Sequence, residues 1–318
     1  MDTPREFHYR FPGRIGGQRP GSHPGSSVGA GQEFVAHRSL FDYPDPRRLD
    51  LRASLRTLQD EWLVRVNRQR TGTAARALVD VSASMSFGVS RPKLHVIADF
   101  VEALGLSAFR VGDAAGMMAF DIAERTELFM PARVSRGMGS IMAAALREWS
   151  DGHKGSNGFV RRGAAARDGR ATHHGVSAHH DGSARREGPA TGLEDAASRL
   201  VGQQGLVFLL SDFHWPLERL TVALDLMAHA TVIPIVVWDH AETNPPTQNA
   251  LASLSDMESS RRRTLWLRPK LRDEWRRSVA RRRTEIEDFF HAHTLRPFYM
   301  EGSFDPDALS RYFFEAEA

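Results

Sequence analysis

Residues 77–88 read ALVDVSASMSFG, an apolar segment that passes into closely spaced hydroxyl and carboxyl side chains. The mostly apolar run Ala75–Val81 predicts a buried strand. Asp80, Ser82 and Ser84 lie at the end of that strand. In α/β proteins, ligands bind at the carboxyl ends of the sheet strands. These three side chains are therefore the first candidates for a functional site.

Around this segment, apolar strand-like runs alternate with runs of helical periodicity. Helices are predicted for 93–109, 140–149, 215–229, 270–293 and 306–314. Strands are predicted for 115–120, 127–130, 205–210, 231–238 and 295–300, and a hairpin for 250–254 with 264–267. Strands that are apolar throughout and alternate with helices predict a parallel sheet covered on both faces. The predicted fold class is therefore three-layer α/β with a mostly parallel central sheet.

Two regions depart from this alternation. Residues 1–70 hold twelve arginines and no lysine, and residues 11–32 are rich in Gly, Pro and Ser. We interpret 1–70 as an irregular, arginine-rich N-terminal extension that packs on the core, and 71–318 as the main domain. Residues 150–192 have one aromatic residue and almost no aliphatic periodicity, which predicts a disordered insertion.

Composition excludes several classes of protein. The chain of 318 residues has no cysteine, so disulfide scaffolds, Cys-ligated zinc, thiolate catalysis and iron–sulfur clusters are excluded. No apolar run approaches the ~20 residues that span a bilayer, and the polar start MDTPREFHYR has no apolar signal core. We expect a soluble, cytoplasmic protein without a membrane span.

The small formal net charge of +3 hides charge segregation. Residues 261–283 carry eleven basic and two acidic side chains, whereas residues 284–318 carry two basic and eight acidic ones. The basic segment Arg261–Arg283 leaves nucleic-acid binding open as an alternative function. A solvated helix face with acidic neighbours explains the same pattern, so no nucleic-acid partner is expected.

Three polar groups follow core elements in chain order. They are Asp80–Ser84, the helix-opening Gly137–Ser140, and Ser211–Asp212 after another apolar strand. Carboxylate and hydroxyl oxygens are the ligands that hard divalent cations such as Mg²⁺ prefer. The competing interpretation is that the serines cap helices or turns and that Asp212 starts a helix. Spacing alone does not separate these two readings.

The run ALVDVSASMSFG followed by Lys93 resembles the metal-ion-dependent adhesion site of von Willebrand factor A domains. More narrowly, most of the chain resembles the bacterial family catalogued as domain of unknown function fifty-eight, whose members have a von Willebrand factor A-like fold. The motifs that carry this resemblance are His8–Arg10, Arg19–His23, Gly29–Phe34, Tyr43–Asp50, Ser211–Phe213, Asp239 with Glu242, and Asp256–Glu258.

The resemblance implies a fold, a metal site and a partner. Its metal ligands would be Asp80, Ser82, Ser84, Ser140 and Asp212, with Ser140 in place of the usual threonine. Family members are often encoded beside MoxR-type AAA+ ATPases. It therefore implies a non-enzymatic, Mg²⁺-dependent protein-binding module that works with such an ATPase on a client protein. The module and the ATPase would assist the assembly of client proteins such as methanol dehydrogenase, or the insertion of a cofactor or metal into them.

Two further questions stay open at this point. The first is whether the same site belongs to an enzyme. A Ser–His–Asp hydrolase could use Ser82 or Ser84 with His214 and Asp212. A metal-dependent, phosphatase-like hydrolase could instead use Asp80 and Asp212, with Lys93 as the nearby phosphate-binding lysine. The chain lacks the Gly-x-Ser-x-Gly and Gly-x-x-x-x-Gly-Lys motifs, which argues against an enzyme. The second question concerns the crowded motif Asp45, Arg47, Arg48 and Asp50, which is either a partner-docking surface or an internal salt-bridge network.

Overall fold

The computed structural model describes residues 6–11, 20–29, 31, 33–57, 61–153, 189–245, 251–255, 262–266 and 268–315. The part of the predicted insertion between 154 and 188 lies outside these residues. Both of its ends are helical, because one helix runs to His153 and the next begins at Pro189. The prediction of disorder over the whole of 150–192 is therefore wrong at its ends, where the flanking helices continue.

A six-stranded sheet forms the centre of the molecule, in the order β11-β8-β7-β4-β5-β6. The strands are β4 (Ala74–Asp80), β5 (Ala114–Phe120), β6 (Met130–Arg133), β7 (Leu206–Ser211), β8 (Thr231–Trp238) and β11 (Phe298–Glu301). All neighbouring pairs are parallel except β5 with β6. β4, β5 and β7 are buried along their whole length or nearly so, as the apolar sequence runs predicted.

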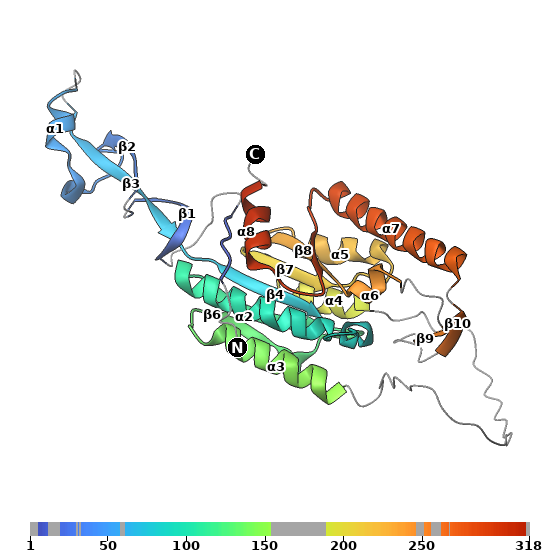
Figure 1. Cartoon of the computed structure of the whole chain (residues 1–318). Coiled ribbons are helices and arrows are strands. Elements are labelled where there is room, and N and C mark those ends of the chain that lie inside the picture. The colour runs from blue at the N-terminus through green and yellow to red at the C-terminus, as the bar shows by residue number, and fades with distance from the viewer. Residues whose placement is uncertain are drawn as a thin grey trace, which may run out of the picture.

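Helices cover both faces of this sheet (Figure 1). On one face lie α2 (Lys93–Val111), α3 (Met138–His153) and α8 (Pro306–Glu315), and on the other lie α4 (Pro189–Ser198), α5 (Leu220–Leu226) and α7 (Pro269–Ala292). Side chains alternate between the faces along each strand, so Phe208 packs in the first layer and Leu209 in the second. The predicted three-layer α/β class is confirmed.

A small antiparallel sheet projects from this core, and we call residues 33–57 and 61–66 the arm (Figure 1). The strands of this small sheet are β1 (Pro20–Gly29), β2 (Glu33–Ser39) and β3 (Leu63–Thr71), in the order β1-β3-β2. The short helices η1 (Pro46–Arg48) and α1 (Leu51–Ser54) lie between β2 and β3. β3 leads almost directly into β4, so the arm continues the line of a central strand.

Residues 6–11, in contrast, lie against the core. Phe7 is buried and stacks on Phe100 of α2, with ring centroids 5.8 Å apart. Tyr9 is also buried, and its hydroxyl donates to Asp113 Oδ2 at 2.6 Å. His23 Nε2 lies 2.7 Å from the same oxygen, and the Thr73 amide donates to Asp113 Oδ1 at 2.8 Å. One buried carboxylate thus fastens three segments at the amino-terminal end of β5.

Some element boundaries differ from those predicted. The strand predicted for 127–130 lies three residues later as β6, because Thr126–Leu128 forms a 3-10 turn (η3). The helix predicted for 215–229 is shorter, and comprises a 3-10 turn at Leu217–Arg219 (η5) followed by α5. The predicted hairpin is present as β9 (Leu251–Ser255) paired with β10 (Arg262–Trp266). No described helix combines the length and apolarity that crossing a membrane requires.

Candidate functional site

The candidate site lies where three neighbouring parallel strands end. Asp80 is the last residue of β4, Asp212 follows β7, and α6 (His240–Thr243) follows β8. Because these strands are parallel and adjacent, their carboxyl ends meet at one edge of the sheet. The topology therefore brings together residues that are more than a hundred positions apart in the chain.

Asp80 is fully buried, and both of its carboxylate oxygens accept hydrogen bonds. The Ser82 amide donates to Oδ1 at 2.9 Å, while the Ser211 hydroxyl and the Trp215 indole N–H donate to Oδ2 at 2.6 and 3.3 Å. Burial, together with the nearby charge of Asp212, raises the pKa of Asp80 to about 6. Asp80 therefore joins the β4 and β7 loops through internal hydrogen bonds.

Ser82 and Ser84 stand between the two aspartates. Ser82 precedes the short 3-10 helix η2 (Ala83–Ser86), and its hydroxyl lies 3.3 Å from that of Ser84. The Ser84 hydroxyl also lies near Asp212 and helps to lower the pKa of that carboxyl. Four of the five predicted metal ligands, Asp80, Ser82, Ser84 and Asp212, thus form one cluster.

Asp212 forms a buried ion pair with Lys93, the first residue of α2. Lys93 Nζ donates to Asp212 Oδ2 and to Glu242 Oε1, both at 2.8 Å. Burial alone would lower the pKa of Lys93, but the two carboxylates outweigh it and the pKa is raised. Burial likewise opposes the charge of Asp212, yet Lys93 and His214 hold its pKa down at about 2. The ammonium and the Asp212 carboxylate are both charged at neutral pH.

Ser140 does not join this cluster. It is exposed on α3, and its hydroxyl donates to Glu102 Oε1 of α2 at 3.5 Å. Gly139 sets this arrangement, because a Cβ there would lie 2.4 Å from the Glu102 carbonyl oxygen. α2 and α3 therefore pack in close contact at this glycine, and Gly137–Ser140 contributes to helix packing. No hydrogen bond between described residues links Ser140 to the two aspartates.

A divalent cation does not fit the described arrangement. Mg²⁺ binds carboxylate oxygens at about 2.1 Å and prefers an octahedral set of oxygens. Here the Lys93 ammonium already lies on Asp212, internal donors occupy both oxygens of Asp80, and Ser140 bonds to Glu102. Magnesium binding stays a prediction from sequence, and the measurements below test it.

The turn after β7 shows how the site is held in shape. Phe213 has a left-handed backbone with φ of 50°, which is uncommon for a bulky residue. Its ring is buried against Phe290 of α7, with centroids 5.3 Å apart, and Arg282 donates to its carbonyl oxygen at 3.1 Å. Arg282 also donates to the Trp215 carbonyl oxygen at 2.6 Å. Part of the basic segment thus serves the fold by fixing this turn.

Other arginines of α7 pair with acids along the same helix or nearby. Arg281 and Arg283 lie 3.7 and 3.3 Å from Glu285 and Glu287, and Arg283 also reaches Glu301 at 3.2 Å. These pairs match the predicted solvated face with acidic neighbours. The charges of Arg281 and Arg283 are therefore balanced by acidic side chains of the same chain.

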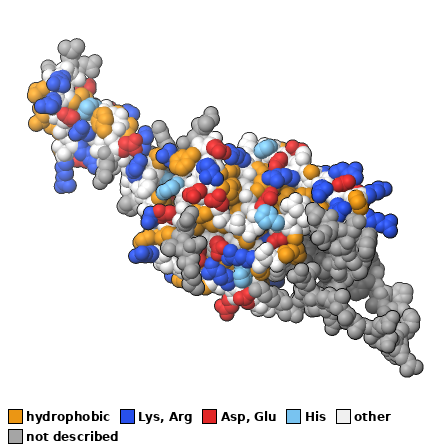
Figure 2. Space-filling view, in the orientation of Figure 1, with side chains coloured by type: hydrophobic (Ala, Val, Ile, Leu, Met, Phe, Trp, Pro, Cys, Tyr) orange, Lys and Arg blue, Asp and Glu red, His pale blue; other side chains and the backbone are white. Residues whose placement is uncertain are grey.

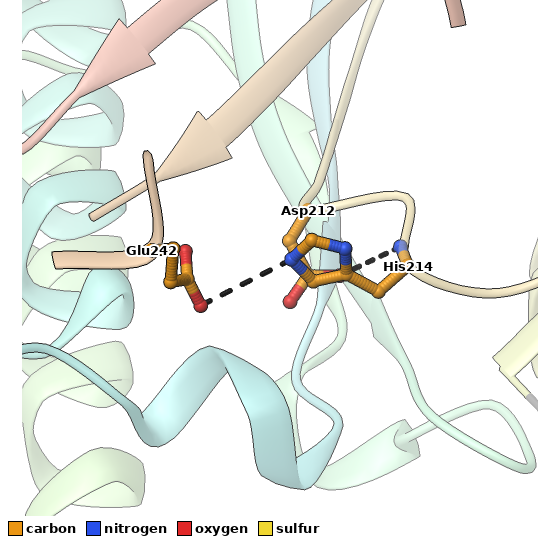
Figure 3. A group of neighbouring side chains, drawn as sticks. All are labelled: Asp212, His214 and Glu242. Atoms are coloured by element: carbon orange, nitrogen blue, oxygen red, sulfur yellow. Dashed lines mark hydrogen bonds and ion pairs between the residues drawn. The ribbon is translucent and has the colours of Figure 1, made fainter. Parts of the chain in front are cut away.

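His214, Asp212 and Glu242 form a second cluster at the rim of the site (Figure 3). One ligand atom from each lies within 4.8 Å of the other two, and His214 Nε2 is 4.0 Å from Glu242 Oε1. The His214 side chain is 44% exposed, and its ring stacks on that of Trp238 with ring centroids 6.1 Å apart. A pocket of about 300 Å³ opens here, with cationic and anionic walls from Arg281, Arg282, Glu242 and Glu285.

The N-terminal motif residues have local roles in the arm. Asp45 accepts from the Arg47 amide and pairs with Arg48 at 3.1 Å, which caps η1. Asp50 accepts from the Ala53 amide, which caps α1, and also contacts His37 and Arg65. The side chain of Arg47 is exposed. The two aspartates therefore shape the turns that carry the arginines.

The pairing of Lys93 with Glu242 is the feature that sequence reasoning missed. Lys93 has a place in the von Willebrand factor A resemblance and in the hydrolase alternative, and Glu242 has one in a family motif, but nothing in those motifs connects the two residues. One signal was present in the sequence. Lys93 lies at helical spacing from Ile97, Val101 and Leu104, so it shares the face of α2 that packs against the core.

The raised pKa of Asp80 predicts a distinct pH dependence of stability. Because this pKa lies above the ordinary 3.8, the folded state binds a proton more tightly than the unfolded state. The free energy of unfolding should therefore fall as pH rises from about 4 to about 6, by on the order of 2–3 kcal/mol. The stability of Asp80→Asn should not show this decrease with pH, because asparagine does not titrate. Urea unfolding of both proteins across this pH range measures it, and parallel curves would contradict the assignment.

Several solved structures are similar to this chain at low sequence identity. The chain is similar to an aerotolerance-related membrane protein from Bacteroides fragilis NCTC 9343, solved with multiple mutations to serines. Identity is 11% over 77% of this chain and 98% of that one, with a TM-score of 0.35. It is also similar to the conserved hypothetical protein BatB from Bacteroides thetaiotaomicron, with 13% identity, coverage of 78% and 100%, and a TM-score of 0.36.

A von Willebrand factor type A protein from Catenulispora acidiphila is a third similar structure. It shares 12% identity over 79% of this chain and 43% of that chain, with a TM-score of 0.33. No curated protein matches the chain. The family model described as "Protein of unknown function DUF58" matches residues 44–285, more than half of the chain, and the protein therefore belongs to this family, as its motifs predicted.

Proposed function

We propose that this protein is a protein-binding module that works without catalysis. Its partner would be a MoxR-type AAA+ ATPase, and the pair would assist assembly, or cofactor or metal insertion, of a client such as methanol dehydrogenase. The proposal leaves out the predicted Mg²⁺ bridge, because Lys93 already pairs with the carboxylate that would hold the ion. The family resemblance supports the ATPase partner.

The observation that carries the proposal is the surface of the arm. Phe41 and Leu55 are 92% and 82% exposed, far more than large apolar side chains usually are in a folded domain. Further exposed apolar side chains of the arm are Phe34, Val35, Tyr43, Leu51 and Trp62. Apolar side chains gathered on one small, projecting element are typical of protein interaction sites.

Arginines lie among these apolar side chains (Figure 2). Arg47, Arg52 and Arg56 are exposed on the segment between β2 and β3. Aromatic residues and arginine are enriched where proteins bind one another, because both bury large areas and arginine forks onto carboxylates. The arm therefore suits a partner surface that offers apolar and acidic groups.

The site at the strand ends gives little support to an enzyme. A serine nucleophile needs a base within hydrogen-bond reach, yet the Ser82 and Ser84 hydroxyls contact each other and the aspartates. His214 stacks on Trp238 and points toward Glu242 (Figure 3). In the part of the chain that the structure describes, neither serine has an imidazole partner.

A pulldown with purified MoxR-type ATPase from the same genome tests the proposal. Replacing Phe41 and Leu55 together by serine should weaken binding about tenfold or more, because a few anchoring side chains contribute most of the binding free energy of a protein interface. Val222→Ser on α5 is the control, since Val222 is also an apolar, exposed residue, at 50% exposure, but lies outside the arm. No binding by the unaltered protein, or equal binding by all three proteins, would refute the proposal.

A further inference from the structure

The environment of Lys93 is unusual for a lysine. The residue is only 1% exposed, although lysine is almost never fully buried unless its charge is paired. Its ammonium lies at the sheet edge, at the place where the sequence predicts a divalent cation. Two hydrogen bonds of 2.8 Å, to Asp212 and to Glu242, hold it there.

The ammonium and a metal ion would compete for this place. A divalent cation bound to Asp212 at about 2.1 Å would come close to an ammonium that donates to the same carboxylate. Two positive charges at such a distance repel strongly in a buried site. The site therefore accommodates one of the two cations, and the chain itself supplies Lys93.

Glu242 completes this arrangement with a second acid. Its Oε1 accepts from Lys93, and its Oε2 accepts from the Asp239 amide at 2.9 Å in a capping box of α6. Its backbone carbonyl accepts from the Trp275 indole of α7 at 2.7 Å. Glu242 is thereby fixed in orientation. It holds the position beside the cation that an acidic side chain of a partner would take in a metal-bridged contact.

We propose that Lys93 is a built-in cation and Glu242 a built-in acidic ligand, so that the strand-end site is closed within the chain and needs no divalent metal. Lys93 replaces the ion, and Glu242 replaces the acid of a partner. This inference concerns the sheet edge and stands whether or not the arm binds the ATPase. It directs partner binding away from the strand ends.

The neighbouring imidazole offers the strongest competing site. Asp212, His214 and Glu242 are close enough to hold a transition metal together. However, the Glu242 oxygen that is 4.0 Å from His214 is the same atom that accepts from Lys93. A metal there would again have to displace the ammonium, so Mn²⁺ and Zn²⁺ both belong in the test.

The first measurement uses the unaltered protein without any partner. Titration calorimetry with Mg²⁺ and Zn²⁺, and paramagnetic resonance with Mn²⁺, should detect no stoichiometric binding up to millimolar metal. The melting temperature should be the same in EDTA and in metal. One-to-one binding that is lost in Asp212→Asn or in His214→Ala would overturn the inference.

The second measurement removes the ammonium. Lys93→Ala leaves Asp212 and Glu242 facing an open position, so Mn²⁺ should now raise the melting temperature by about 5 °C or more. A folded Lys93→Ala variant that gains no metal affinity would show that the two cations do not share one position. If this variant fails to fold in EDTA, refolding upon addition of Mn²⁺ supports the inference, and failure to refold with metal present contradicts it.

Discussion

Lys93→Met should destabilise the protein by about 3–5 kcal/mol, the largest effect that we expect from one substitution. Methionine retains the apolar stem but removes the ammonium, so the buried Asp212 carboxylate loses its counterion. Glu242 loses the same partner, but its unpaired charge costs less free energy because water reaches this partly exposed side chain. Urea unfolding at neutral pH measures the difference, and the midpoint should shift with little change in slope.

Lys270→Met provides the control for this substitution. Lys270 lies in the first turn of α7 and is exposed, so the same chemical change should alter stability by less than about 0.5 kcal/mol. Equal effects of the two substitutions would mean that the buried ion pair does not stabilise the sheet edge. The double variant Lys93→Met with Asp212→Asn should recover part of the loss, because it removes the uncompensated charge.

Asp113→Ala should also destabilise the protein strongly, by about 3 kcal/mol or more, because it leaves buried donors without acceptors. Tyr9, His23 and the Thr73 amide all depend on this one carboxylate. Burial, reinforced by Asp113, raises the pKa of Tyr9 well above its usual value, so the phenol stays a neutral donor. Denaturant unfolding gives the magnitude, and limited proteolysis should show earlier cleavage near the N-terminus.

Asp225→Ala is the matched control, since Asp225 is exposed on α5. It should leave both stability and the cleavage pattern unchanged within about 0.5 kcal/mol. The loss of stability in Asp113→Asn should lie between those of Asp113→Ala and Asp225→Ala, because the amide of asparagine retains one acceptor oxygen. If cleavage near the N-terminus were as slow in Asp113→Ala as in the unaltered protein, residues 6–11 would have to be held mainly by the packing of Phe7.

The sequence alone predicted the elements of the central sheet well, for a local reason. β7 and β8 are apolar except for Ser211 and Thr231 at their ends, because both faces of these strands pack against helices. Such runs are visible without any structure. The arm was not predicted as strands. Its residues are mostly exposed or half-buried, so the alternation that marks a half-buried strand is weak there.

The candidate site was predicted only in part. Asp80, Ser82, Ser84 and Asp212 could be placed together because strand order and direction bring them to one edge. Ser140 could not be placed, because its position depends on the close packing of Gly139 against α2. A glycine in a helix shows no periodicity that would reveal such a contact.

What the sequence determined by itself is the fold class, the family and the edge of the sheet where chemistry gathers. These follow from short-range patterns and from the rule that parallel strands end on one side. Only the tertiary structure decided which cation pairs with the acidic side chains at this edge. Lys93 and Glu242 are 149 residues apart, and the pairing depends on how α2 and α6 pack at the sheet edge. No local pattern encodes that packing, because it is set by the combined shape of all three layers.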